Sequence, residues 1–365
     1  MLAADWYDSK HGLRARKAAR WGYLRPPASG KLIWLACGSD AHGIALGAEL
    51  TQAIRKKRLD VQLVLTVERE IPVLQSVQSL TKSAWGYAPS DHPRAVERAL
   101  ARLNPFALIT CGVPPRKNLA AALTTIQHRL AIACAAPQSP AAFEQGYPAS
   151  EAQARSWPAE SIGATVDLTS LLVEAQVDPN FRSLVNGSSP RHLWWLHSNE
   201  DGSLHELAKR FRSVFGNDVL FVSGLAPKRA ERSKRAAVKH ISEWDRSVLG
   251  DGDIMLVDEP KWLPAVAAAV TATHLEVPPP RLLWQAMAGG AAISCNDQAL
   301  LPKAHLGEAI AEFKSHEVLF YQWRAYRDNP ILARSSADAA RRKFWEERRL
   351  AARVNDELLE RVFAW

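Results

Sequence analysis

The 365-residue chain has few cysteines and no long apolar run. Both features limit the kinds of protein it can be. The cysteines are Cys37, Cys111, Cys134 and Cys295. They lie far apart in apolar segments and lack the short spacing of metal-ligating pairs, which favours buried free thiols in a reducing compartment. No apolar stretch approaches the roughly 20 residues that span a membrane. Residues 1–8 lack the basic and apolar regions of a secretory leader, so we expect a cytoplasmic protein.

The composition is that of a folded protein with an excess of positive charge. Hydrophobic residues make up 47% and charged residues 23%, and the length suits two domains. The net charge is +8, and many of the basic residues are clustered in three segments, at residues 10–25, 228–239 and 334–353. Such clusters are either solvated helix faces or contacts for a nucleotide phosphate, a nucleic acid or an anionic membrane.

Aromatic residues favour the membrane among these anionic partners for the first cluster. Trp6, Tyr7, Trp21 and Tyr23 interleave with its basic residues. Basic residues mixed with Trp and Tyr are typical of a peripheral contact with an anionic membrane. No zinc finger, aromatic RNA-binding signature or DNA-binding element occurs, so we expect no nucleic-acid partner.

Short apolar runs alternate with helix-like segments along most of the chain. In the first half, the predicted strands are Leu32–Cys37, Val61–Thr66, Ala107–Cys111 and Leu130–Ala135, and the predicted helices are Ile44–Arg55, Ile71–Thr81, Arg94–Leu103 and Leu119–Gln127. In the second half, the strands are Leu193–His197, Asp218–Val222, Ile254–Val257 and Ala291–Cys295, and the helices are Leu204–Val214, Glu231–Glu243, Lys261–Ala269 and Leu282–Gly289. This alternation predicts an α/β protein with two parallel sheets, each covered by helices on both faces.

The predicted halves are separated by a run of turn-forming residues, NGSSP at 186–190. We predict a basic and aromatic segment at residues 1–30, a first domain at 31–185, a second at 191–330 and C-terminal helices at 331–365. From Glu308 onward the sequence predicts helices only. Two such domains would place a ligand cleft between them, at the carboxyl ends of both sheets.

One strand–turn–helix in the first half has the character of a binding site. The apolar run before Gly38 ends at Gly38-Ser39-Asp40, and a helix-prone run follows. Free backbone N–H groups at the start of a helix suit an anionic group. His42 falls in the first turn, where a neutral imidazole could take a proton from a hydroxyl. The alternative for His42 is a residue that only caps the turn. Asp40 is a rival base, although N-capping of the same helix is its expected role.

Five short motifs occur in an order known from one family. They are KAARWG at 17–22, IWLACGS at 33–39, YAPSD at 87–91, SNEDG at 198–202 and PKRAER at 227–232. They resemble, in turn, the Arg-x-Gly, Ile-Trp-Ile-His-Ala-x-Ser, Pro-x-Asp, Ser-Thr-His-x-Gly and Pro-Arg-His-Pro-Glu-Arg segments of the bacterial lipid A Kdo (3-deoxy-D-manno-octulosonic acid) transferases. By segment order, the resemblance extends over roughly residues 15 to 330.

The resemblance implies a GT-B fold, in which two Rossmann-like domains face each other across a cleft, followed by C-terminal helices. It implies a glycosyltransferase of lipopolysaccharide biosynthesis that moves a sugar from CMP-Kdo to a lipid A precursor. The acceptor hydroxyl would displace the nucleotide directly, with no metal or other cofactor. The protein would lie at the cytoplasmic face of the inner membrane, bound peripherally through its N-terminal segment.

Several family residues are replaced. His42 takes the place of the catalytic Glu, and of the family's Glu-x-Glu-x-Trp-Pro-Asn segment only the final Asn118 remains. In the donor loop, Trp284 takes the place of the Glu that would bind the donor ribose. These changes leave two alternatives open: an inactive relative that keeps a binding role, or a transferase with a different nucleotide sugar.

The candidate site residues follow from the turn, the motifs and the charges. We predict His42 as the base. The predicted acceptor contacts are Gly38, Ser39, Asp40 and Asn118, although a plain turn is the alternative for Asn118. The predicted donor contacts are Ser198, Asn199, Lys228, Arg229, Arg281 and Gln285, with Lys228 and Arg229 on the phosphate. An exposed basic helix start is the alternative for the last pair, and an exposed loop for Arg281. We expect Trp194, Trp195 and Trp284 in the core.

Overall fold

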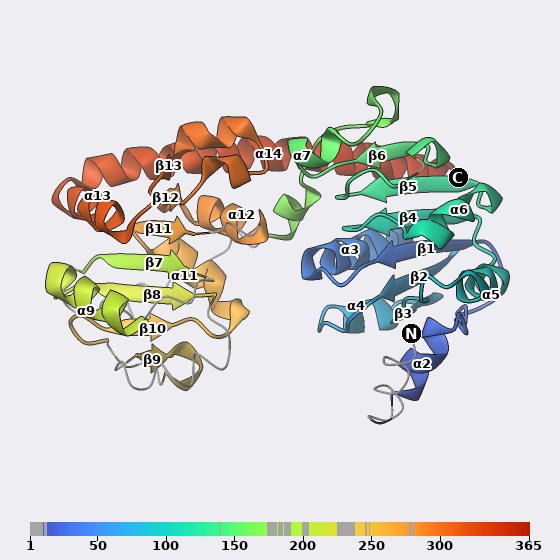
Figure 1. The fold of residues 1–365 in the computed structure, drawn as a ribbon, viewed down its shortest axis with the longest axis horizontal. Helices are drawn as coiled ribbons and strands as arrows, with labels where there is room; N and C mark the ends of the chain where they lie inside the picture. Colours follow the sequence, from blue (N-terminus) through green and yellow to red (C-terminus); the bar gives the residue numbers. More distant parts are fainter. Residues whose placement is uncertain are drawn as a thin grey trace. The chain divides into compact units, whose positions relative to one another are not determined.

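The computed structural model describes residues 10, 13–138, 140–173, 181, 185, 191–198, 204–224, 238–244, 247, 249–276 and 280–365. The chain divides into two compact units. Unit 1 consists of residues 1–172 together with 349–365, and unit 2 consists of residues 173–348. Each unit is built around one parallel sheet (Figure 1).

Unit 1 contains a six-stranded parallel sheet in the order β3-β2-β1-β4-β5-β6. The strands are β1 (Leu32–Cys37), β2 (Gln62–Val67), β3 (Ser83–Tyr87), β4 (Ala107–Cys111), β5 (His128–Ile132) and β6 (Gln145–Tyr147). The central strands β2 and β4 are buried along their whole length. Their continuous apolar runs are what a parallel sheet covered on both faces requires.

Helices cover both faces of this sheet. They are α2 (Arg14–Arg20), α3 (Ala41–Lys57), α4 (Leu74–Gln78), α5 (Pro93–Leu103), α6 (Lys117–Ala121) and α7 (Glu151–Ala154). On one face, α3 packs against Ile33 and Leu35 of β1, and on the other, α5 packs with Trp34. Helix α5 begins with Pro93 at its first turn and ends at Asn104, whose φ of 42° is left-handed.

Unit 2 contains a seven-stranded parallel sheet in the order β13-β12-β11-β7-β8-β10-β9. The strands are β7 (Leu193–His197), β8 (Val219–Ser223), β9 (Lys239–His240), β10 (Ile254–Leu256), β11 (Ala272–Leu275), β12 (Ala292–Cys295) and β13 (Ile310–Glu312). Its helices are α9 (Leu204–Phe215), α11 (Leu263–Ala269), α12 (Pro280–Gly289), α13 (His316–Asp328) and the long α14 (Pro330–Ala364).

Trp194, Trp195 and Trp284 of unit 2 are core residues, as expected. Trp194 packs with α9 and α13, whereas Trp195 lies on the opposite face of β7 with α11 and α12. Trp284 is fully buried beside Phe344 of α14. Trp284 is therefore a packing residue.

Helix α14 contributes to the cores of both units. Phe344 packs in unit 2, while Leu358 and Val362 pack against the sheet of unit 1. At its end, Arg58 donates to the backbone oxygens of Val362 and Phe363 at 3.0 and 3.2 Å. These contacts fasten the last turns of α14 to unit 1.

The predicted parallel sheets are confirmed, and three strands match to the residue: β1, β4 and β7. Short strands were missed, among them β3, β6, β11 and β13, so the expectation of helices only after Glu308 is wrong. The helix predicted at Glu231–Glu243 is wrong over its described part, which starts at 238. There, β9 pairs with β10 and Ile241 enters the core, so tertiary pairing outweighs helix propensity.

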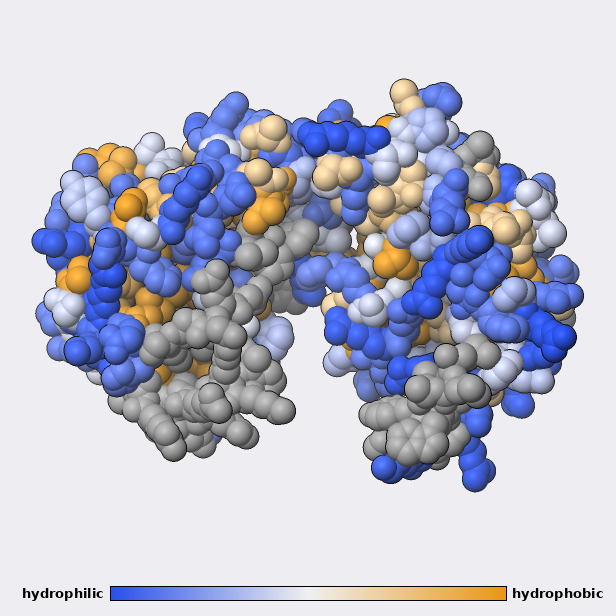
Figure 2. Space-filling view, viewed as in Figure 1, coloured by the Kyte–Doolittle hydropathy of each residue, from blue (hydrophilic) through white to orange (hydrophobic). Residues whose placement is uncertain are grey.

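None of the helices within the described residues is long and apolar enough to cross a membrane. The face drawn in Figure 2 is mainly hydrophilic over the described parts of each unit. The four cysteines are free and buried, as predicted.

Removing a buried side chain of α14 should destabilise unit 1. Leu358 has no exposed surface, so Leu358→Ala should lower the free energy of unfolding by about 2–5 kcal/mol. Leu59, 68% exposed in the same unit, is the control, and Leu59→Ala should change it by less than about 0.5 kcal/mol. Urea denaturation compares the variants. Equal effects of the two would contradict the packing of α14 on this core.

Candidate functional site

In unit 1 the strand order reverses between β1 and β4, and the chain turns at the carboxyl ends of both. Ligand sites of open α/β sheets form at such a switch point. Two cavities of about 640 and 280 Å³ lie at this edge of the sheet. They share part of their lining, including Ser39, Glu68 and Arg116. We call them the large and the small compartment.

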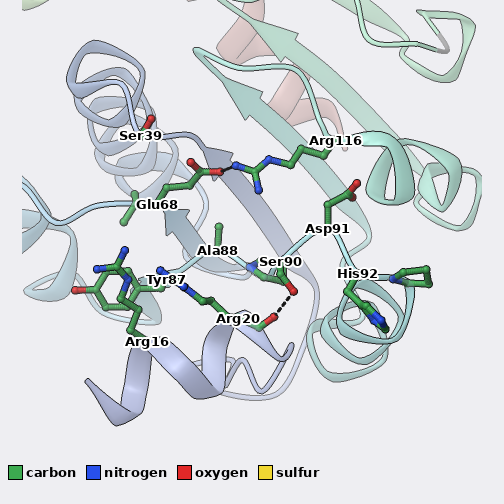
Figure 3. Close-up of a pocket in the computed structure, with 13 residues that line it drawn as sticks. Arg16, Arg20, Ser39, Glu68, Tyr87, Ala88, Ser90, Asp91, His92 and Arg116 are labelled. Atoms are coloured by element: carbon green, nitrogen blue, oxygen red, sulfur yellow. Dashed lines mark hydrogen bonds and ion pairs between the residues drawn. The ribbon is translucent and has the colours of Figure 1, made fainter. Parts of the chain in front are cut away.

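The large compartment is lined by three arginines, two from one helix and one from a loop. Arg16 and Arg20 come from α2, and Arg116 comes from the connection between β4 and α6 (Figure 3). The Arg16 guanidinium lies 5.5 Å from the ring centre of Tyr87, which also lines the cavity. The Ser90 hydroxyl donates to the backbone oxygen of Arg20 at 2.8 Å and ties α2 to the cavity wall.

Both carboxylates in the lining have partners. Glu68 forms an ion pair with Arg116 across the cavity. Asp91 accepts hydrogen bonds from the backbone N–H groups of Asn118 and Leu119, at 3.0 and 3.2 Å. Three arginines against two carboxylates give the lining an excess of positive charge.

The small compartment lies against the sheet face formed by Trp34, Thr66 and Thr110. The indole of Trp34 donates to the Thr66 hydroxyl at 2.8 Å. Thr110 is only 1% exposed, and its Oγ1 has no nitrogen or oxygen partner among the described residues. Its neighbour is the Cys134 thiol, a weak hydrogen-bonding group. The sheet face of this cavity therefore presents buried hydroxyls, and its charged residues, Glu68, Asp91 and Arg116, are those it shares with the large compartment.

The turns at the switch point depend on close backbone contact. A Cβ on Gly43 would lie 2.9 Å from the Cα of Gly112, and Gly112 has a φ of +78°. A side chain at Gly38 would meet Val113 at 2.6 Å. Glycine alone allows these loops to approach each other here.

The structure separates the residues predicted on this side. Asp40 is the N-cap of α3 and accepts from the Gly43 N–H at 2.8 Å, as its capping role predicts. Ser39 lines both compartments. Asn118 lies in the first turn of α6, and its side chain donates to the Asp91 backbone oxygen at 2.7 Å. His42 lies in the first turn of α3, half-buried, and lines neither compartment.

In unit 2 the corresponding reversal lies between β7 and β11. His197 ends β7 and is 8% exposed. Its Nδ1 lies 2.9 Å from the Ser223 hydroxyl, which also accepts from the Trp195 indole. Its Nε2 has no partner among the described residues. Burial lowers the pKa of His197 to about 4, against the opposing charge of Glu276, so the ring is neutral at pH 7.

Glu276 follows β11 and is 3% exposed. Burial raises the pKa of its carboxyl, but hydrogen bonds from His316 and Ser198 outweigh this effect and leave it below the ordinary value. His316, in the first turn of α13, lies 3.1 Å from Glu276. His274 lies two residues before Glu276. Burial lowers the pKa of His274 to about 4, and the His274 Nε2 donates to Asn296 at 2.8 Å. The unit 2 edge thus carries one carboxylate among buried imidazoles.

The predicted donor residues are only partly described. Ser198 lies at this edge beside Glu276. Arg281 is exposed in the first turn of α12, and Gln285 is buried on the same helix. Asn199, Lys228 and Arg229 lie outside the described residues. Their roles as donor contacts stay predictions.

No protein-family model and no curated protein matches this chain. Solved structures do match its fold. Acinetobacter baumannii MurG is 10% identical over 89% of this chain and 99% of that one, with a TM-score of 0.51, and an α-glucosyltransferase in complex with UDP is 10% identical, with a TM-score of 0.53. The chain has a GT-B fold.

Other structures with the same GT-B architecture include epimerases. The UDP-GlcNAc 2-epimerase from Neisseria meningitidis, solved with UDP-GlcNAc, is 9% identical over 89% of this chain and all of that one, with a TM-score of 0.60. HepE from Anabaena, solved with UDP-glucose, is 12% identical over 92% of this chain and all of that one, with a TM-score of 0.56. At these identities the likeness concerns the GT-B fold.

Sequence reasoning did not select Glu68, Thr110, His197 or Glu276. A usable signal existed for two of them, because Glu68 and Glu276 are the first charged residues after buried strands. Thr110 and His197 lie inside apolar strands, where polar side chains are expected to be satisfied core residues. Arg16 and Arg20 were assigned to a membrane contact, and the structure places both in the cavity wall.

The buried histidines should make stability depend on pH. The unfolded chain takes up protons near pH 6.5, whereas His197 and His274 do so only near pH 4 in the folded state. Stability should therefore fall as the pH falls from about 6.5 towards 4, by up to about 1.4 kcal/mol per pH unit for each histidine.

Thermal unfolding between pH 7.5 and 5 measures this slope. His274→Gln should flatten it, whereas His205→Gln, a change at an exposed position of α9, should not. A slope that His274→Gln leaves unchanged would contradict the assignment of this proton uptake to His274.

Proposed function

We propose that this GT-B chain is a nucleotide-sugar-dependent glycosyltransferase of bacterial surface-glycan assembly. The observation that carries the proposal is the chemistry at the two switch points. The unit 1 edge has a basic, hydroxyl-lined cavity for an acceptor, and the unit 2 edge has a buried carboxylate and a neutral imidazole for a nucleotide sugar. We propose CMP-Kdo as donor and a lipid A precursor as acceptor, on the resemblance of the sequence motifs.

The donor-side argument rests on His197 and Glu276. A buried neutral imidazole with an available Nε2 can hydrogen-bond a polar ligand without the cost of desolvating a charge. A carboxylate held by His316 accepts hydrogen bonds, and sugar hydroxyls donate them. His197 ends β7 and Glu276 follows the neighbouring β11, at the edge where GT-B sheets are open to ligands.

A second donor is supported by the structural relatives. Several of the matching structures are described as complexes with UDP, UDP-glucose or UDP-GlcNAc. A UDP-sugar is therefore the alternative to CMP-Kdo. This chain differs from the Kdo transferases in the donor loop, where Trp284 is a core residue, and this difference supports the alternative.

Calorimetric titration with CMP and with UDP tests the donor side. One nucleotide should bind, and His197→Ala should weaken it at least tenfold through the loss of a buried hydrogen bond. His205→Ala, at an exposed position of α9, should leave the affinity unchanged. If neither CMP nor UDP binds the wild-type chain, the proposed function is wrong.

Turnover tests the base. The assay uses CMP-Kdo or a UDP-sugar as donor and a lipid A precursor as acceptor. His42→Ala should lower kcat by a factor of about 10² or more, because no general base would then remove the proton from the reacting hydroxyl. Wild-type turnover that survives His42→Ala would exclude this residue as the base. Nucleotide binding without any turnover would favour an inactive relative with a binding role.

A further inference from the structure

We propose that the unit 1 site selects a sugar that carries an oxyanion, either a phosphate or a carboxylate. The large compartment would bind the oxyanion through Arg16 and Arg20, and the small compartment would hold hydroxyls of the sugar ring. This inference rests on the proposed function, because it names the class of acceptor at the same site.

The charge of the large compartment is built by elements that are distant in sequence. Arg16 and Arg20 are one helical turn apart on α2, so their side chains lie on one face of the helix. Glu68 is paired with Arg116, and Asp91 with the start of α6, so both carboxylates of the lining are already engaged. Arginine suits phosphate and carboxylate because its planar group offers paired donors.

Helix α2 is held against unit 1 by specific contacts. Arg98 of α5 donates to the Trp21 backbone oxygen at 2.6 Å, and Ser90 donates to that of Arg20. Gly22, with a φ of +81°, passes so close to α5 that a Cβ would lie 2.2 Å from the Ala95 oxygen. A helix that served only as a solvated basic surface would not require such close packing. The arginines are thus held at the cavity wall.

The small compartment has the complementary chemistry. Thr110 Oγ1 is buried without a nitrogen or oxygen partner among the described residues, and buried polar groups normally have one. A ligand hydroxyl that reaches this face would be a hydrogen-bond partner for Thr110. Thr66 lies on the neighbouring β2, beside the Trp34 indole, so two hydroxyls face one cavity from two strands.

The ion pair between Arg116 and Glu68 lies where the compartments meet, because both residues line both cavities. A ligand that occupies both compartments must pass these two side chains. An oxyanion on one side and a hydroxylated ring on the other would place polar atoms next to both members of the pair. The division therefore favours a ligand with two chemically distinct ends over a simple anion.

Calorimetry of the full chain with N-acetylglucosamine 1-phosphate, glucuronate, N-acetylglucosamine and inorganic phosphate tests the proposal. At least one anionic sugar should bind tenfold or more tightly than both N-acetylglucosamine and inorganic phosphate. The tighter-binding of the two anionic sugars identifies the oxyanion. Equal affinity for the neutral sugar would overturn the role of the arginines. Equal affinity for inorganic phosphate would overturn the role of the small compartment.

Variants locate the binding. Arg16→Gln and Arg20→Gln should each weaken the anionic sugar at least tenfold, whereas Arg14→Gln, at an exposed position of the same helix, should not. Thr110→Val keeps the side-chain shape and removes the hydroxyl, so it should weaken the anionic sugar about threefold to tenfold but leave inorganic phosphate unchanged. Circular dichroism checks that each variant is folded. Equal losses in Arg14→Gln and Arg16→Gln would place the anion elsewhere.

The two proposals can fail separately. Nucleotide binding is measured on the same samples, and His197→Ala should weaken the nucleotide without changing the affinity for the anionic sugar. If the anionic sugar binds and neither nucleotide does, the proposed function is wrong and the unit 1 site stands. If a nucleotide binds and no anionic sugar does, the unit 1 proposal is wrong.

Discussion

The reversal of strand order within each all-parallel sheet is the constraint on which the rest of the molecule depends. A parallel sheet needs helices on both faces, and the chain must leave the central pair of strands in opposite directions. The strand order places this point at the carboxyl ends of β1 and β4 in unit 1, and of β7 and β11 in unit 2. The cavity-lining residues of unit 1, and His197 and Glu276 of unit 2, lie at these edges.

The two edges use burial in opposite ways. At the unit 2 edge, burial keeps His197 and His274 neutral, whereas hydrogen bonds from His316 and Ser198 keep Glu276 charged against the effect of its burial. At the unit 1 edge, the charges belong to side chains of the cavity rim, and the buried groups are hydroxyls. One edge is therefore suited to a ligand with many hydrogen-bonding groups, and the other to one whose charge lies at one end.

The sequence predicted the architecture well because long apolar strands such as β1 and β7 and a capped helix such as α3 carry strong local signals. Short strands such as β11 carry weak ones, since their pairing depends on neighbours distant in the chain. The site was predicted less well. Ser39 was found from its turn, but Thr110 and His197 resemble core residues until the whole sheet is assembled. The position of Arg16 and Arg20 in the cavity wall could not be predicted from the charges of α2, because it depends on the packing of this segment on α5.

The shared use of α14 has a consequence for synthesis on the ribosome. Unit 1 begins near the N-terminus, but Ala351, Val354, Leu358 and Val362 complete its core. A domain that is made first usually folds first. Here the sheet of unit 1 must wait, with part of one apolar face uncovered, until all of unit 2 has been translated. The order in which the two units reach their final packing is therefore set by the last helix rather than by the first strand.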